Sequence, residues 1–112
     1  MTQDKRDPRA IAAVKGTKDI LPGEVGQWQA VEAAVRHVVE LYGYRELRAP
    51  VIEPTELFEK GTGETSDIVI KEMYTFTDKG GRSITLRPEY TPSVVRAIIE
   101  HRLDLLPEPL RY

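Results

Sequence analysis

The 112-residue sequence contains no cysteine, which excludes disulfide bonds and thiolate metal sites and fits a reducing cytosol. Histidine is scarce. His37 falls off the apolar face of a predicted helix and His101 stands near a helix end, so we expect no metal site. No apolar run approaches the roughly 20 residues of a membrane span, and the polar N-terminus lacks the apolar core of a signal peptide. These absences predict a soluble protein that holds no metal.

An excess of one charge is also missing. Lys and Arg number 16 against 18 Asp and Glu, giving a net charge of −2, which does not indicate nucleic-acid binding but leaves a local basic patch open. The 40% hydrophobic and 30% charged content is typical of a soluble globular protein, and the length suffices for one domain with a modest core.

The clearest helical pattern covers residues 24–42, where apolar side chains recur at spacings of three and four. The stripe consists of Val25, Trp28, Val31, Val35, Val38, Val39 and Tyr42. We interpret it as core or subunit interface. Gly43 is expected to end the helix in a left-handed conformation. Residues 1–14 are expected to form a flexible N-terminal segment.

The segment after this helix predicts short alternating elements. Residues 44–49 read as a strand that Pro50 ends, and 51–54 read as extended chain. Thr55 is a suitable N-cap for a short helix through residue 60. Residues 61–64 are interpreted as an ordinary loop, because they lack the Gly-Lys-Ser/Thr ending of a phosphate-binding loop.

Residues 71–97 carry the densest set of structural signals. The β-formers of 73–76 and 83–86 flank Asp78-Lys79-Gly80-Gly81, which is turn chemistry and predicts a hairpin. Pro88 is expected to end the second strand, since proline cannot donate to a ladder. Arg82 and Arg87, on the hairpin strands, are interpreted as surface charges.

A helix over residues 92–101 is expected to follow, with Thr91 as N-cap and Pro92 at the first helical position. Its expected buried side consists of Val94, Val95, Ile98 and Ile99. Glu89 and Thr91 then lie at a strand–helix junction. This pair has a purely structural interpretation, and a rigid junction is also how polar small-molecule sites are mounted.

From Lys15 onward the sequence resembles the N-terminal part of a histidine–tRNA ligase, a class II aminoacyl-tRNA synthetase. The matching blocks are Lys15-Gly16-Thr17-Lys18-Asp19-Ile20-Leu21-Pro22, then 42–50, then 71–97. The most specific block is Glu72-Met73-Tyr74-Thr75-Phe76 followed by Leu86-Arg87-Pro88-Glu89-x-Thr91. The resemblance implies an α+β fold: a truncated class II catalytic domain over 15–112, with an antiparallel sheet and flanking helices.

The resemblance also implies an activity. Members of the family are ATP-dependent ligases that attach histidine to its tRNA through histidyl-adenylate. The resemblance therefore implies ATP with Mg²⁺ as a substrate and no tightly bound cofactor. Glu89 and Thr91 correspond to residues lining the histidine pocket, within a hairpin and helix over 71–101. Gly43 and Pro50 belong to the first signature motif, about 25–50, which builds the interface of a homodimer.

The same resemblance places the second motif, whose arginine binds the ATP phosphates, just beyond Tyr112. We therefore expect no catalytic residue within this fragment, and the fragment alone to be inactive. Two departures concern the pocket's shape. Tyr90 stands where many bacterial members have glycine, and Pro92-Ser93 stands where they often have small residues such as Ala-Gly.

Two alternatives stay open. One is a regulatory paralogue of the synthetase in histidine biosynthesis, a non-catalytic histidine sensor, which would also retain Glu89 and Thr91. The intact 86–89 and 15–22 segments favour the ligase. The other is a synthetase of the same subclass for another amino acid, which the 73–76 block disfavours.

Overall fold

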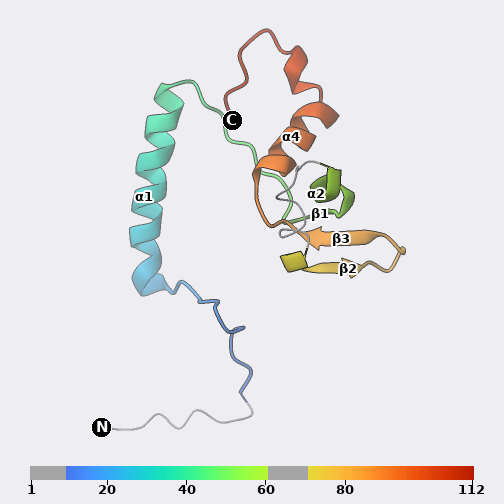
Figure 1. Cartoon of the computed structure of the whole chain (residues 1–112). Helices are drawn as coiled ribbons and strands as arrows, with labels where there is room; N and C mark the ends of the chain where they lie inside the picture. Colours follow the sequence, from blue (N-terminus) through green and yellow to red (C-terminus); the bar gives the residue numbers. More distant parts are fainter. Residues whose placement is uncertain (1–9, 61–70) are drawn as a thin grey trace. The chain divides into compact units, whose positions relative to one another are not determined.

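A computed structural model of the chain describes residues 10–60 and 71–112. The predicted loop over 61–64 and most of the predicted flexible segment over 1–14 lie outside these residues. The described chain falls into two units, one ending at Tyr42 and one beginning at Gly43. Figure 1 labels the elements along the chain.

The first unit contains α1, Pro22–Leu41, which confirms the predicted helix and begins it two residues earlier. Pro22 suits the first turn because its missing N–H is not needed there. Lys18 pairs with Glu24 in that turn at 2.8 Å. Gly43 has a φ of 77°, the left-handed conformation expected after the helix end. No residue of α1 is buried, and its apolar stripe is exposed except for the half-buried Val25.

The second unit is built on a three-stranded antiparallel sheet. Its strands are β1 (Ile52–Pro54), β2 (Thr75–Thr77) and β3 (Ser83–Leu86), in the order β1-β3-β2. The central strand β3 pairs with both neighbours. With the helices that accompany it, this sheet confirms the expected α+β class.

The register places one polar row across the sheet. Glu53 lies opposite Thr85, which lies opposite Thr75, and side chains alternate between faces along each strand. Thr85 is fully buried and Glu53 is 4% exposed. The Thr85 hydroxyl donates to Thr55 Oγ1 at 2.9 Å and lies 2.9 Å from Thr75 Oγ1. The buried face of the sheet is therefore polar, and its hydroxyl groups satisfy one another.

Three helices accompany the sheet: α2 (Glu56–Lys60), α4 (Thr91–Glu100) and the 3₁₀ turn η1 (Leu103–Leu105). In Figure 1, α2 and α4 lie next to each other beside β1, and α2 contacts both α4 and β1. Phe58 of α2 and Ala97 of α4 form the apolar part of the core, at 3% and 8% exposure. Thr55 directly precedes α2, as expected of an N-cap, but its hydroxyl is used in the sheet network, 2.7 Å from Ser83 Oγ.

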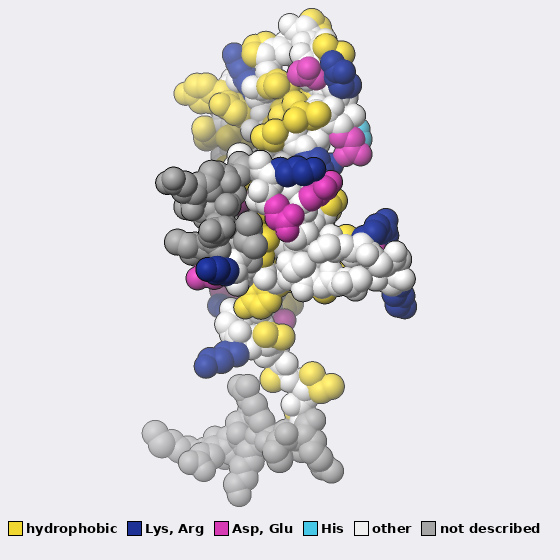
Figure 2. Space-filling model, turned by 45° about the vertical axis from the view of Figure 1, so that its right-hand side comes forward, with side chains coloured by type: hydrophobic (Ala, Val, Ile, Leu, Met, Phe, Trp, Pro, Cys, Tyr) yellow, Lys and Arg dark blue, Asp and Glu magenta, His cyan; other side chains and the backbone are white. Residues whose placement is uncertain are grey.

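The expected buried side of α4 was partly wrong. Ser93 and Ala97 are buried, Val94 and Ile98 are half-buried, and Val95 and Ile99 are exposed. The helix meets its neighbours through small side chains, which allow close approach, and its larger apolar side chains lie to either side. Figure 2 shows hydrophobic side chains at the surface around α4 and η1; the exposed ones of these two elements and the residue after them include Val95, Ile99, Leu105 and Leu106.

The prediction of a strand over 44–49 was wrong. This segment belongs to no strand, although the Arg45 N–H donates to the Arg111 carbonyl oxygen at 2.9 Å. No neighbouring strand pairs with it among the described residues, and side chains hold its C-terminal end instead. The residues that follow do form β1, as the extended pattern over 51–54 indicated. Among the described residues, no helix has both the length and the apolar character to span a membrane.

Candidate functional site

The hairpin that leads to the candidate site is closed by the side chain of Asp78. Its Oδ1 accepts the backbone N–H groups of Gly80 and Arg82, both at 2.9 Å, and its Oδ2 pairs with Arg82 Nε at 2.8 Å. The hydrogen bond from the Arg82 backbone is the main cause that lowers the pKa of Asp78 below its ordinary value. Gly81, at a φ of 82°, supplies the left-handed residue of the turn.

The strand–helix junction lies between Leu86, where β3 ends, and Thr91, where α4 begins. The structure corrects the predicted cap: Tyr90 is the N-cap residue, with helical φ and ψ of −90° and −31°, and no side chain caps the helix. Thr91 is the first helical residue, because the Tyr90 carbonyl already accepts the Val94 N–H at 3.2 Å. The Thr91 hydroxyl is therefore not used in capping.

Glu89 and Thr91 are both exposed at this junction. Among the described residues, neither side chain has an ion-pair or hydrogen-bond partner. Glu89 stands two residues before the start of α4, where the partial positive charge of a helix N-terminus favours a carboxylate. The junction therefore presents an acceptor-only carboxylate and a hydroxyl that donates and accepts, both available to a ligand.

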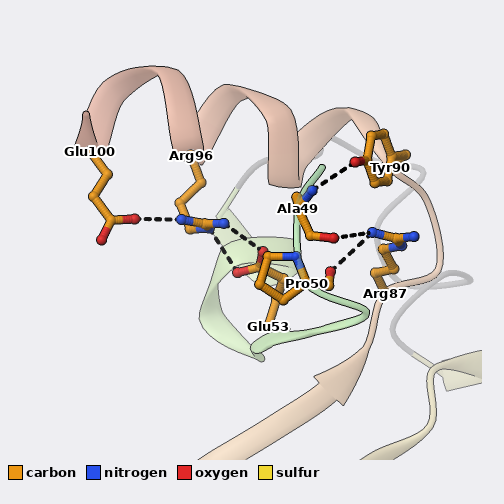
Figure 3. A network of polar contacts seen from close by, with 7 residues as sticks. All are labelled: Ala49, Pro50, Glu53, Arg87, Tyr90, Arg96 and Glu100. Atoms are coloured by element: carbon orange, nitrogen blue, oxygen red, sulfur yellow. Dashed lines mark hydrogen bonds and ion pairs between the residues drawn. The ribbon is translucent and has the colours of Figure 1, made fainter. Parts of the chain in front are cut away.

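Arg87 and Tyr90 anchor this junction to residues 47–50 (Figure 3). Arg87 Nη1 donates to the carbonyl oxygens of Ala49 and Pro50, each at 3.0 Å. The Ala49 N–H donates to Tyr90 Oη at 2.8 Å, and that hydroxyl donates to the Leu47 carbonyl at 3.1 Å.

The two anchoring side chains also contact each other. The Arg87 guanidinium carbon lies 4.2 Å from the centroid of the Tyr90 ring, a cation–π contact. Arg87 was expected to be a surface charge and is instead half-buried and bonded. Tyr90 was expected only to affect the shape of a pocket. Their partners lie some 40 residues earlier in the chain, so local pattern carried no signal for them.

A second charged group lies beneath α4. Arg96 pairs with the buried Glu53 of β1 and with Glu100 one turn further along its own helix (Figure 3). The hydrogen bond to Glu53 is the main cause that raises the pKa of Arg96 above its ordinary value. Arg96 thus neutralises the buried carboxylate of Glu53, and we interpret this group as one that stabilises the fold.

The remaining predicted residues are placed as follows. Gly43 lies at the end of α1, and a Cβ added there would come within 3.1 Å of Arg111 Nη1. Pro50 contributes the carbonyl that Arg87 contacts. His37 is exposed on α1, and His101 is the C-cap of α4. Within residues 10–60 and 71–112, no three His, Asp or Glu side chains are grouped as metal ligands.

Comparison with known proteins identifies relatives for nearly the whole chain. The sequence profile described as histidyl-tRNA synthetase matches residues 16–112. A histidine–tRNA ligase of Desulforamulus reducens is 61% identical over 97 residues, which are 87% of this chain and 23% of that protein. One from Caldicellulosiruptor bescii is 60% identical over 102 residues, covering 91% of this chain and 24% of the relative.

Solved structures share the fold. The apo histidyl-tRNA synthetase of S. aureus has a TM-score of 0.75 and 42% identity, over 89% of this chain and 23% of that one. A Bacillus halodurans protein described as an ATP phosphoribosyltransferase regulatory subunit/histidyl-tRNA synthetase has a TM-score of 0.73 at 21% identity, over 94% and 26%. The chain thus spans about a quarter of the length of its relatives. Since the profile matches all but the first 15 residues, the chain belongs to the histidyl-tRNA synthetase family.

Proposed function

We propose that these residues form the N-terminal part of the catalytic domain of a class II, ATP-dependent histidine–tRNA ligase. Histidine would attack the α-phosphate of ATP, bound with Mg²⁺, to give histidyl-adenylate, and the 3′ end of tRNA(His) would then accept the histidyl group. The observation that carries this proposal is the pair Glu89 and Thr91, exposed and unpartnered among the described residues, within a chain that belongs to this family.

Glu89 and Thr91 are proposed to bind the α-ammonium group of histidine. A carboxylate and an ammonium form a charge-assisted hydrogen bond, which is about twice as strong as a neutral one. The Thr91 hydroxyl adds an acceptor for the same ammonium. The groups that stabilise the reacting phosphate, usually the largest catalytic term, are proposed to lie outside these 112 residues. The described region therefore supplies substrate binding and no catalytic residue.

The apolar stripe of α1, with Gly43 and Pro50, is proposed to belong to the first signature motif, about 25–50, and to the interface of a homodimer. The stripe includes a half-exposed tryptophan, Trp28, and a row of exposed valines. Such a surface is typical of one that another subunit covers. The cysteine-free composition supports a cytoplasmic location.

The regulatory paralogue is not favoured. Both curated relatives described above carry the name histidine–tRNA ligase, at 60% identity or more. The likeness to the Bacillus halodurans protein, at 21% identity, concerns the fold alone.

A chimaera tests the proposal. Residues 16–112 would replace the matching region of the S. aureus histidyl-tRNA synthetase, and histidine-dependent exchange between pyrophosphate and ATP would be measured. We expect exchange by the chimaera, and its loss or strong reduction when Glu89→Gln is added. The matched control is Glu59→Gln, which removes a charge from an exposed position of α2. A folded chimaera without exchange, or exchange that Glu89→Gln leaves unaltered, would contradict the proposal.

A further inference from the structure

The junction that carries Glu89 is held at two points, one on each side of it. Arg87 and Tyr90 both extend their side chains to residues 47–50, and together they make four hydrogen bonds with backbone groups there. Figure 3 shows those with Ala49 and Pro50. The Arg87 backbone N–H adds a fifth, to the Val51 carbonyl at 2.9 Å. We refer to Arg87 and Tyr90 as the junction clamp.

The clamp leaves little freedom to the residues between its two points. These are Pro88, whose ring fixes φ near −65°, and Glu89. The Tyr90 backbone is fixed further by the first turn of α4. Fixing the backbone of one residue costs roughly 1–2 kcal/mol of conformational entropy. The conformational entropy of the Glu89 backbone is therefore already lost on folding, before any ligand binds.

The side chains divide by role along this short segment. The side chains of Arg87 and Tyr90 form hydrogen bonds with residues 47–50. The side chains of Glu89 and Thr91 are exposed and make no such contact among the described residues. The hairpin and the helix alone would fix the two ends of the junction, but they would not fix the distance between the junction and residues 47–50. The clamp supplies that third restraint.

We propose that Arg87 and Tyr90 are positioning residues, which fix the orientation of Glu89 so that its carboxylate meets a ligand's ammonium group in bonding geometry. This inference rests on the proposed histidine site. The clamp itself does not touch the ligand. Its effect on histidine binding passes through Glu89. A positioning role therefore predicts that the effect disappears when Glu89 is substituted, whereas a contribution to stability alone does not.

The test uses the complete ligase, in which these residues precede the rest of the catalytic domain, with histidine affinity measured by calorimetric titration. Tyr90→Phe keeps the ring and its contact with Arg87 but removes both hydrogen bonds of the hydroxyl. We expect the dissociation constant for histidine to rise roughly three- to tenfold, the effect of one ordinary hydrogen bond, with ATP affinity unchanged. Tyr74→Phe is the matched control, because Tyr74 is an exposed tyrosine of the same hairpin region.

The decisive comparison adds Tyr90→Phe to Glu89→Gln. If the clamp acts through Glu89, the double variant should bind histidine no more weakly than Glu89→Gln alone. Fully additive losses, or a Tyr90→Phe variant with unchanged histidine affinity, would overturn the proposal. If Glu89→Gln by itself has no effect, the proposed histidine site fails instead, so the two failures are distinguishable.

A second variant covers the case in which Tyr90→Phe does not fold. Arg87→Lys keeps the charge but loses the planar group that stacks on Tyr90 and reaches two carbonyls. We expect the same loss of histidine affinity and the same dependence on Glu89. Native circular dichroism of either variant, with histidine affinity unchanged, would contradict the clamp.

Discussion

Arg96 of α4 holds the buried carboxylate of Glu53 in β1 through two nitrogens, with Nη2 at 2.9 Å from Oε1 and Nε at 2.8 Å from Oε2. The Glu53 side chain is 3% exposed and that of Arg96 is 25% exposed. A carboxylate so far from water is costly unless it is paired. This pair therefore fixes α4 over the polar row of the sheet, and α4 in turn carries Thr91 at its start.

Arg96→Met should destabilise the folded protein by about 3–5 kcal/mol, the range observed when one partner of a buried ion pair is removed. The double variant Glu53→Met/Arg96→Met should recover much of this loss, because no buried charge is then left unpaired. Denaturant midpoints of the two variants check this. A double variant that is less stable than Arg96→Met alone would show that the pair is needed for more than mutual neutralisation.

Asp78→Asn should weaken the hairpin in a pH-dependent way. The pKa of Asp78 is lowered in the folded chain, so its stabilising contribution is present above the unfolded value and is lost as the pH falls through the folded value. The wild type should therefore melt at a higher temperature than Asp78→Asn at pH 7. This gap should close at pH values below the folded pKa, where the carboxyl group is protonated. Asp104→Asn, at an exposed pair, is the control, and a gap of constant size would rule out the carboxylate as its source.

If the proposed histidine site is correct, Glu89→Gln should weaken histidine binding to the proposed ligase by about 1.5–3 kcal/mol, the scale of a hydrogen bond to a charged group. This corresponds to roughly 10- to 150-fold in the dissociation constant. ATP affinity should change little, since the carboxylate is proposed to contact the ammonium group alone. Calorimetric titration with histidine measures the change, and an unaltered constant would remove Glu89 from the site.

The 112-residue chain by itself should show no exchange of pyrophosphate with ATP, since it spans about a quarter of its relatives. We also expect it to self-associate, because the apolar stripe of α1 and the sheet residues Phe76 and Leu86 are exposed. Exchange assays run beside analytical ultracentrifugation test both expectations. Robust exchange by a stable monomer would mean that the phosphate-binding groups lie within these residues.

Much of this arrangement could be predicted from local pattern. Periodicity located α1, turn chemistry located the Asp78 hairpin, and the sequence around Glu89 located the junction, because each signal involves residues close together in the chain. The left-handed Gly43 was predictable for the same reason.

The rest depends on contacts between distant residues. Tyr90 carried no signal of its hydrogen bonds to Leu47 and Ala49, which lie 43 and 41 residues earlier. Patterns of apolar residues also could not indicate that Thr85 and Glu53 fill the buried face of the sheet, because burial of polar groups depends on partners supplied by other strands. The predicted strand over 44–49 failed similarly, since a strand needs a neighbour that propensity does not reveal.

The spacing of these contacts along the chain has a kinetic consequence. The β2–β3 hairpin closes only a short loop at Asp78, whereas the Tyr90 hydroxyl closes one of about 40 residues, and longer loops cost more entropy to close. We expect the hairpin to form early in folding and the Tyr90 contacts to form late. Pulsed hydrogen exchange should then protect the amides of β3 before that of Ala49, and protection of Ala49 first would reverse this order. Substitutions at Asp78 would slow folding, while those at Tyr90 would mainly speed unfolding.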